Sequence, residues 1–452
     1  MDQRHREIEL VKAFGTAGVR GIFNRTQTAE QVYRLAETIA FASGKGRYGV
    51  GWDGRKASAV LARTVMAAVS AVGSDVNVFG MVPTPVLAFG TKSRDCLMGF
   101  SVTASHNPAE FSGVKVFNRV GMELPKSDEE RIERAMGVDV MKSAGNFGEF
   151  VSDEVIVDDY IAALVSRYPR APHPLRIAID CASGPGGLVT PEILKALGHR
   201  VVPVNAQVSW RFPARPPEPT AANLAAFAAM VPALGVDVGF AHDGDADRLV
   251  MVDASGNVVP DSVLTILALR GLGLGSGTAV LSENTSSAVA EEALRLGLNV
   301  QRSRVGKTFA VLVSEGGVFA AEPSKVVDPA WGLWEDGINA SAIISTLLSS
   351  DPGALDRVMQ QVQWRFRQTN LRMPVKMDRL MVQARESFKK FRVSEERRLD
   401  GLKLVMGDGS WVMFRPSGTE PLTRLYCESK DPQVLDALVQ TGSQCIEASN
   451  TP

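Results

Sequence analysis

The stretch VDVGFAHDGDADRLVMVD, residues 236–253, decides the fold, because two apolar runs flank a short loop rich in aspartate. The runs predict two buried strands, and the polar loop between them predicts a tight connection. Asp243, Asp245 and Asp247 occupy alternate positions of this loop. Carboxylates at such spacing can converge on one hard cation, and ligand sets made only of oxygen favour Mg²⁺ over soft metals.

A solvated acidic turn is the other interpretation of this loop. Three carboxylates this close, hemmed in by apolar strands, repel one another unless a cation or Arg248 compensates their charge. A calcium EF-hand is excluded, since its sixth and twelfth positions require Gly and Glu where this loop has Arg248 and Ala254. A site for a divalent cation is therefore the better hypothesis.

A second motif is TASHNP, residues 103–108, which lies between the apolar runs LMGFSV and GVKVF. A serine just past a strand, in a turn fixed by Asn107 and Pro108, presents its hydroxyl at the edge of a sheet, where open α/β folds bind ligands. Ser105 is thus either a nucleophile or an ordinary turn serine, and this motif alone does not decide between them.

Two further motifs are rich in glycine and arginine. In RPSGTEP, residues 415–421, consecutive backbone N–H groups around Gly418 can form an anion-binding nest, and Arg415 and Arg424 can bind phosphate bidentately. In FGTAGVRG, residues 14–21, the glycines permit close approach of a ligand and Arg20 supplies a fixed positive charge. Each is a weak signal by itself, because Gly-rich turns are common.

Short apolar runs alternate with helix-like segments over most of the chain, as in βαβ units that build largely parallel sheets. Such cycles open with strands at 48–51, 176–180 and 279–281, whereas the residues after about 370 show an α+β pattern. We expect three related α/β domains with mixed, mostly parallel sheets and a C-terminal α+β domain. Their predicted ranges are 1–148, 149–253, 254–368 and 369–452. The Pro-rich segment 211–220 predicts a surface connection inside the second domain.

Composition excludes several classes of protein. The 452 residues carry 49 basic and 50 acidic side chains, a net charge of −1, which argues against general binding of nucleic acid or of anionic membranes. No apolar run is long enough to span a bilayer, and the charged start lacks the features of a secretory signal, so we expect a cytoplasmic protein. Four widely spaced cysteines predict free thiols. We expect a monomer or a homodimer.

In this order, the motifs FGTAGVRG, TASHNP, DGDADR and RPSGTEP resemble those of the α-D-phosphohexomutase superfamily, which includes phosphoglucomutase/phosphomannomutase and phosphoglucosamine mutase. The resemblance extends from residue 14 to residue 424. It implies four domains around a central cleft. It also implies an intramolecular phosphotransferase of the isomerase class, which interconverts hexose or hexosamine 6-phosphates and 1-phosphates. The implied cofactors are Mg²⁺ and a hexose 1,6-bisphosphate that serves as intermediate and activator, and the implied partner is a phosphosugar substrate.

The resemblance also assigns residues to roles. Ser105 would be the phosphoserine, and Mg²⁺ would be held by this residue with Asp243, Asp245 and Asp247. The residues implied around the reacting centre are Arg20, His106, Lys115 and Arg248. Those implied to bind the substrate's other phosphate are Arg415, Ser417, Gly418, Thr419 and Arg424. Such a constellation suits phosphoryl transfer, which is catalysed mainly by positioning and by electrostatic stabilisation.

The sugar-recognition loop departs from the family's usual GGExSGH, since the corresponding stretch here is FAAEPSKV, residues 319–326. Glu322 and Ser324 match and can bind the sugar hydroxyls, whereas Lys325 and Val326 replace Gly-His. Lys325 either binds the substrate's phosphate or is a solvated surface lysine. Lys307, which we also expect to bind substrate, either faces the cleft or begins a helix.

Two alternative functions stay open at this point. A metal-dependent sugar phosphatase would result if water reached the phosphoserine. A non-catalytic phosphosugar-binding homologue would explain the altered sugar loop.

Overall fold

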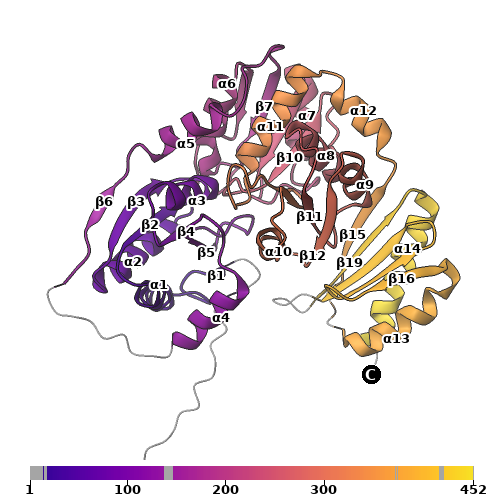
Figure 1. Ribbon diagram of the computed structural model, residues 1–452, viewed down its shortest axis with the longest axis horizontal. Helices are drawn as coiled ribbons and strands as arrows, with labels where there is room; N and C mark the ends of the chain where they lie inside the picture. The colour runs from indigo at the N-terminus through magenta and orange to yellow at the C-terminus, as the bar shows by residue number, and fades with distance from the viewer. Residues whose placement is uncertain are drawn as a thin grey trace, which may run out of the picture. The chain divides into compact units, whose positions relative to one another are not determined.

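The computed structural model describes Phe14 and residues 18–136, 146–371, 373, 375–416 and 422–450. The chain forms two compact units (Figure 1). The first unit comprises residues 1–272 and 324–354, and the second comprises residues 273–323 and 355–452. The four domain ranges expected from the sequence stay a prediction beside this division.

The first unit begins with a six-stranded sheet in which only the pairs made by β5 are antiparallel. Its strand order is β1 (Val19–Ile22), β5 (Phe111–Asn118), β4 (Met98–Val102), β2 (Arg47–Trp52), β3 (Asp75–Met81) and β6 (Phe150–Ser152). Its helices are α1 (Ala29–Ser43), α2 (Ser58–Ala71), α3 (Thr84–Ser93) and α4 (Lys126–Ala135). Figure 1 shows α1 and α2 on one side of this sheet and α3 on the other.

Local sequence explains how these helices begin and pack. Thr28 and Gln31 form a capping box at the start of α1, in which each side chain accepts a hydrogen bond from the other's backbone N–H. Leu35 and Leu61 of α1 and α2 share one buried core with Phe100 of the sheet. The predicted strands at 48–51, 176–180 and 279–281 are confirmed within one residue at each end.

A second sheet of the first unit has the order β10-β9-β7-β8, and only its β9–β10 pair is antiparallel. Its strands are β7 (Arg176–Asp180), β8 (Arg200–Val204), β9 (Val238–His242) and β10 (Leu249–Asp253). The accompanying elements are α5 (Ile156–Val165), the 3₁₀ helix η1 (Pro185–Leu188), α6 (Thr190–Ala196), α7 (Ala225–Leu234), α8 (Asp261–Gly271), β14 (Lys325–Val327) and α11 (Gly337–Ser350). The predicted strand, loop, strand unit of residues 236–253 is thus the β9–β10 hairpin.

The second unit contains a parallel arrangement of β12 (Asn299–Ser303), β11 (Thr278–Ser282) and β13 (Phe319–Glu322). It also contains an antiparallel sheet ordered β15 (Arg365–Leu371), β19 (Thr423–Ser429), β18 (Trp411–Pro416), β17 (Leu402–Met406) and β16 (Val393–Arg397). Its helices are α9 (Ser287–Arg295), α10 (Thr308–Ser314), most of α12 (Ala354–Gln361), α13 (Met377–Ser387), the 3₁₀ helix η2 (Lys389–Phe391) and α14 (Pro432–Asn450).

The predicted fold class is confirmed: the α/β sheets are mixed and mostly parallel, and the C-terminal sheet is antiparallel. Among the described residues, no helix combines the length and the apolar character that crossing a bilayer requires. All four cysteines are buried free thiols, as expected.

Candidate active site

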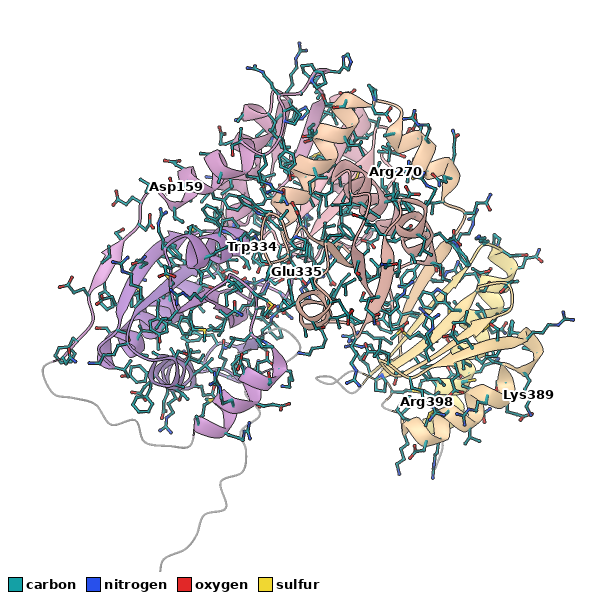
Figure 2. The ribbon with its side chains drawn as sticks, in the orientation of Figure 1. Asp159, Arg270, Trp334, Glu335, Lys389 and Arg398 are labelled. Atoms are coloured by element: carbon teal, nitrogen blue, oxygen red, sulfur yellow. The ribbon has the colours of Figure 1, made fainter. Side chains whose placement is uncertain are left out.

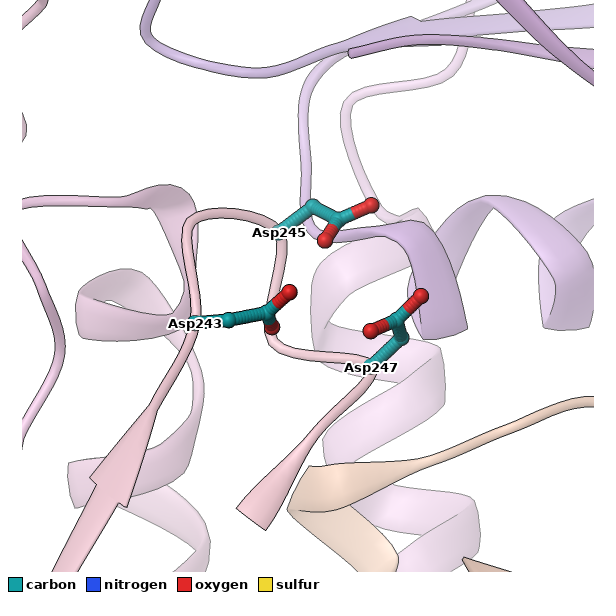
Figure 3. Close-up of side chains that lie close together, drawn as sticks. All are labelled: Asp243, Asp245 and Asp247. Carbon is teal, nitrogen blue, oxygen red and sulfur yellow. The ribbon is translucent and has the colours of Figure 1, made fainter. Parts of the chain in front are cut away.

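The acid loop, residues 243–248, connects β9 to β10 and places the three predicted carboxylates together. One oxygen of each of Asp243, Asp245 and Asp247 lies within 4.8 Å of the others, and all three side chains are buried (Figure 3). The short hairpin forces this convergence, because His242 and Leu249 are paired across the strands that the loop joins. The hypothesis of a solvated acidic turn is therefore wrong.

Lys115 of β5 is the nearest cation to these carboxylates. Its Nζ lies 2.9 Å from Asp245 Oδ2 and 2.5 Å from Asp247 Oδ2, and its side chain is 3% exposed. Burial by itself lowers the pKa of Lys115, but the two carboxylates outweigh burial and the net pKa is raised. The lysine therefore stays protonated and offsets part of the negative charge.

Several oxygens of the acid loop fit a metal ion. Asp245 Oδ1 and Asp247 Oδ1 are buried and lack a hydrogen-bond partner among the described residues. Burial and the neighbouring carboxylates of Asp247 and Asp245 raise the pKa of Asp243 well above its ordinary value. Buried oxygens without partners are costly, so an oxygen-binding divalent cation such as Mg²⁺ suits this donor set.

The serine loop, residues 103–110, connects β4 to β5 and brings Ser105 to the acid loop. Ser105 Oγ donates a hydrogen bond to Asp243 Oδ2 at 2.8 Å, although the two residues are 138 positions apart. Ser105 has the left-handed φ of 49°, and a Cβ on Gly244 would lie 2.4 Å from the Ser105 carbonyl oxygen. Only glycine at position 244 thus permits the two loops to approach so closely.

Arg55, which was not predicted from the sequence, supports the serine loop by hydrogen bonds to its backbone. Its buried guanidinium donates to the carbonyl oxygens of Ser105 at 2.7 Å and Asn107 at 2.6 Å, and also to those of Pro108 and Phe111. Asp53 accepts from Arg55 Nε and from Thr103 Oγ1. Both residues follow β2, so a signal existed: polar residues after a parallel strand face the same sheet edge as the serine.

The other residues predicted around the reacting centre also lie here. His106 Nδ1 is 3.3 Å from Ser105 Oγ, and Arg20 of β1 donates to Asn107 Oδ1 at 2.8 Å. Arg248 Nε is 4.0 Å from Asp243 Oδ2 and 3.9 Å from Asp247 Oδ1. Burial, with the charges of Arg248 and Arg20, lowers the pKa of His106 strongly, so its imidazole is neutral at physiological pH.

The Pro-rich segment 211–220 is more than the surface connection that the sequence predicts. Phe212 and Arg215 are buried, and Arg215 bonds both to Asp180 Oδ2 at 2.7 Å and to the carbonyl oxygen of His242 at 2.6 Å. The His242 ring in turn contacts the carbonyl oxygen of Arg248 at 2.9 Å. Six of its ten residues are exposed, as predicted, but proline marks only an irregular backbone and says nothing about what that backbone packs against. Here the segment supports the acid loop.

The first unit also contains the end of the predicted sugar loop. Ser324, with φ of 62°, donates its N–H to Asp261, and its carbonyl oxygen accepts from Leu249 N at 3.0 Å. Lys325 forms an ion pair with Glu335, and their side chains are 15% and 12% exposed. The prediction of a solvated surface lysine is therefore wrong, whereas phosphate binding by Lys325 stays a prediction.

The second unit carries the remaining substrate-binding candidates. Glu322 Oε1 accepts hydrogen bonds from Gly306 N at 2.7 Å and from the hydroxyl of Thr308. Lys307 is the N-cap residue of α10, but its side chain makes no capping hydrogen bond, and substrate binding by Lys307 stays a prediction. Arg415 and Arg424 are directly paired on β18 and β19, and Arg415 bonds to Asp400 at 2.7 Å. Ser417, Gly418 and Thr419 lie outside the described residues.

Models of the phosphoglucomutase/phosphomannomutase family match three segments of the chain. Alpha/beta/alpha domain I matches residues 11–139, alpha/beta/alpha domain II matches 158–256, and the C-terminal domain matches 369–441. A phosphopentomutase of Thermococcus kodakarensis is 33% identical over 446 residues, covering 95% of this chain and 96% of that protein. A Methanosphaera stadtmanae protein named "Probable phosphoglucosamine mutase" is 32% identical over 454 residues, covering 97% of this chain and 98% of that protein.

A solved structure has the same fold. It is that of a phosphoglucomutase/phosphomannomutase family protein from Burkholderia thailandensis, which superposes with a TM-score of 0.87 at 22% identity and covers 97% of each chain. These similarities extend over nearly the full length of the chain. The chain therefore belongs to the phosphoglucomutase/phosphomannomutase family within the α-D-phosphohexomutase superfamily, and it is an isomerase of the phosphotransferase kind.

Proposed function

We propose that this enzyme interconverts hexose or hexosamine 6-phosphates and 1-phosphates through a phosphoserine at Ser105 and a sugar 1,6-bisphosphate. The observation that carries this proposal is the 2.8 Å contact between Ser105 Oγ and Asp243 Oδ2 inside a buried site rich in charges of both signs. Such a site suits a phosphoryl group, whose transfer depends on positioned charges more than on covalent chemistry.

In the first step, phospho-Ser105 transfers its phosphoryl group to a sugar hydroxyl. The bond from Ser105 oxygen to phosphorus breaks, a bond from the sugar oxygen to phosphorus forms, and the hydroxyl proton leaves to a base. In the second step, the bond from the other sugar oxygen to its phosphorus breaks, a bond from the Ser105 oxygen to that phosphorus forms, and the protonated base returns the proton to the sugar oxygen. The enzyme thus regains its starting state. The Ser105 oxygen thus both donates and accepts a phosphoryl group, as isomerisation requires.

Three residues stay candidates for the proton acceptor: His106, Lys115 and Arg20. Lys115 is engaged by two carboxylates and Arg20 donates to Asn107, whereas a ring nitrogen of His106 lies 3.3 Å from Ser105 Oγ. Arginine stays charged in proteins and is a poor base. Arg20, Lys115 and Arg248 would stabilise charge on the transferred phosphoryl group.

Asp243, Asp245 and Asp247, together with the Ser105 phosphate, would hold Mg²⁺. When bound, this ion would neutralise charge that develops on the phosphoryl oxygens. Lys115 neutralises part of the negative charge of the acid loop, since its ammonium contacts two of the three carboxylates.

For the second unit we propose binding of the substrate's non-reacting phosphate by Arg415 and Arg424, with Ser417, Gly418, Thr419 and Lys307. The direct cross-strand pairing of the two arginines supports this role, because two guanidinium groups can then bind one phosphate. Glu322, held by Gly306 and Thr308, would accept hydrogen bonds from the sugar hydroxyls.

An activity panel tests the proposed function. The purified chain is incubated with Mg²⁺, a trace of glucose 1,6-bisphosphate and the 6-phosphate of glucose, mannose or glucosamine. Because one similar protein is named phosphopentomutase, ribose 5-phosphate with its own bisphosphate belongs in the panel. We expect 1-phosphate to form from at least one hexose. Formation of inorganic phosphate in its place would support a phosphatase, and turnover of none of the sugars would refute the proposal.

Ser105→Ala should lower isomer formation by at least about 10⁴-fold, because the variant lacks the proposed carrier of the phosphoryl group. Ser112→Ala is the matched control: Ser112 is also buried in the first unit, and its hydroxyl has no hydrogen-bond partner among the described residues. We expect this control to retain activity within about twofold. Intact mass of the wild-type protein and of both variants measures whether a phosphate is present and whether it depends on Ser105.

A further inference from the structure

The ion pair of Lys325 and Glu335 joins two segments that are separated in sequence but adjacent in the first unit. The two side chains are 15% and 12% exposed, so the pair is largely removed from water. Figure 2 shows Glu335 and its neighbour Trp334 among densely packed side chains. The family's usual Gly-His cannot form this pair, because neither of those residues carries a fixed charge.

Both segments rest directly on the acid loop. The carbonyl oxygen of Ser324, just before Lys325, accepts from the N–H of Leu249, just after Arg248. A Cβ on Gly337 would lie 2.3 Å from the Arg248 carbonyl oxygen, so the segment that carries Glu335 packs backbone to backbone against the same loop. The ion pair is therefore formed by two segments that pack against the end of the acid loop and the start of β10.

The segment that carries Glu335 is firmly held. The carboxylate of Asp336 accepts hydrogen bonds from Tyr160 Oη at 2.7 Å, Trp331 Nε1 at 2.8 Å and Trp334 Nε1 at 3.1 Å. It also caps α11 by accepting from Asn339 N at 2.8 Å. A residue next to such an anchor has little freedom, so Glu335 can fix the position of the ammonium it binds.

Arg248 connects these two segments to the reacting centre. Its Nε lies 3.9 Å from Asp247 Oδ1, and its carbonyl oxygen is the group against which Gly337 packs. Lys325 and Glu335 each lie within two residues of a backbone contact to Leu249 or Arg248.

We infer that Glu335 is a positioning residue that fixes the Lys325 ammonium beside the acid loop, where it binds a phosphate group of the sugar phosphate. This inference rests on the proposed function and deepens it. A fixed ammonium recognises charge, whereas neutral loop residues recognise hydroxyl groups. Lys325 would therefore recognise a phosphate group and not a sugar hydroxyl at this position.

A double-mutant cycle tests this inference. We measure kcat, KM and the binding of glucose 1,6-bisphosphate by calorimetry for Lys325→Met, Glu335→Gln and the double variant. We expect KM and the dissociation constant to rise about 10- to 100-fold in Lys325→Met and about 10-fold in Glu335→Gln, with kcat within about threefold. The double variant should bind no more weakly than Lys325→Met, because Glu335 acts through the lysine.

The inference would be overturned if the fold-losses of affinity of the two single variants multiplied in the double variant. A fall in kcat with unchanged KM would also overturn it. Glu335→Asp should recover part of the affinity, which a purely structural defect would not do. Lys126→Met is the matched control, since Lys126 also pairs with a glutamate of the first unit, Glu129, at 3.3 Å. Its affinity should stay within about twofold of wild type, and thermal unfolding shows which variants are folded.

The binding measurement separates this inference from the proposed function. If the wild type binds the bisphosphate but isomerises no sugar, the proposed function fails, while the cycle of dissociation constants still tests the roles of Lys325 and Glu335. If wild type and Lys325→Met bind the bisphosphate equally, the inference fails, whatever the activity panel gives.

Discussion

Two buried lysines, one in each unit, have pKa values that are shifted in opposite directions. Lys115 of the first unit lies between two carboxylates, and its pKa is raised. Lys403 of the second unit donates to the carbonyl oxygen of Glu283 at 2.6 Å and lies 3.8 Å from the centre of the Trp411 ring. Burial, together with the charge of Arg302, lowers the pKa of Lys403 to about 7.

The difference teaches that local charge balance, and not burial alone, sets the state of a buried lysine. Both side chains are at most 4% exposed, so desolvation penalises both ammonium groups. Around Lys115 the acid loop supplies excess negative charge, whereas around Lys403 the single carboxylate of Glu283 is opposed by Arg302 and Arg397. A site with excess negative charge is the one prepared for a cation.

Among the variants that test this comparison, Lys115→Met should produce the largest effect. Removing this ammonium leaves Asp245 and Asp247 without their partner, and we expect kcat to fall about 10²- to 10³-fold, as for the loss of one group that stabilises a transition state. Lys403→Met should change kcat less than about threefold. Steady-state kinetics of both variants at saturating Mg²⁺ and substrate checks this pair.

Equal losses of kcat in the two variants would contradict the comparison. Urea unfolding provides the control, because a buried carboxylate pair left without its cation should also destabilise the first unit by about 3 kcal/mol or more in the absence of metal. Addition of Mg²⁺ should restore part of this stability in Lys115→Met if the ion binds the acid loop.

Arg55→Lys should produce an intermediate effect. Lysine keeps the charge but cannot donate to four carbonyl oxygens at once, so the serine loop loses part of its support. We expect kcat to fall about 10- to 100-fold with a smaller change in KM, since the loop positions Ser105 for transfer. Arg63→Lys, on the exposed side of α2, is the control, and unaltered kcat in Arg55→Lys would show that the support is dispensable.

The smallest effect concerns the pH dependence of stability. Between pH 7 and the ordinary lysine value of 10.5, the unfolded chain keeps a proton on Lys403 that the folded chain has lost. The free energy of unfolding contributed by this residue is therefore lowest below pH 7 and rises with pH through this window.

Urea titrations from pH 7 to pH 9 should show this rise in wild type, with a slope of up to about 1 kcal/mol per pH unit relative to Lys403→Met. Lys115→Met should show no such difference in slope, because the raised pKa of Lys115 keeps it protonated in both states below pH 10.5. If the free energy of unfolding changed equally with pH in wild type and Lys403→Met, Lys403 would have to stay charged over this range.

The parts of the site that are local in the chain could be predicted from the sequence. The alternation of carboxylates in residues 243–248 and the turn around Ser105 are short-range patterns, and their structures follow from strand and turn chemistry. Arg55 and Arg215 escaped notice because each supports a loop 50 or 27 positions away, and no local pattern marks such a partner. Lys325 was ambiguous for the same reason, since Glu335 reaches it only in the folded chain.

The sequence by itself determined the fold class, the acid loop, the serine loop and the resemblance to the family. Only the tertiary structure decided that Ser105 and Asp243 touch, that Lys115 is shared by two carboxylates, and that Lys325 is paired. The physical reason is that propensity and hydrophobic periodicity act over a few residues, whereas charge compensation acts through space between segments that the fold brings together.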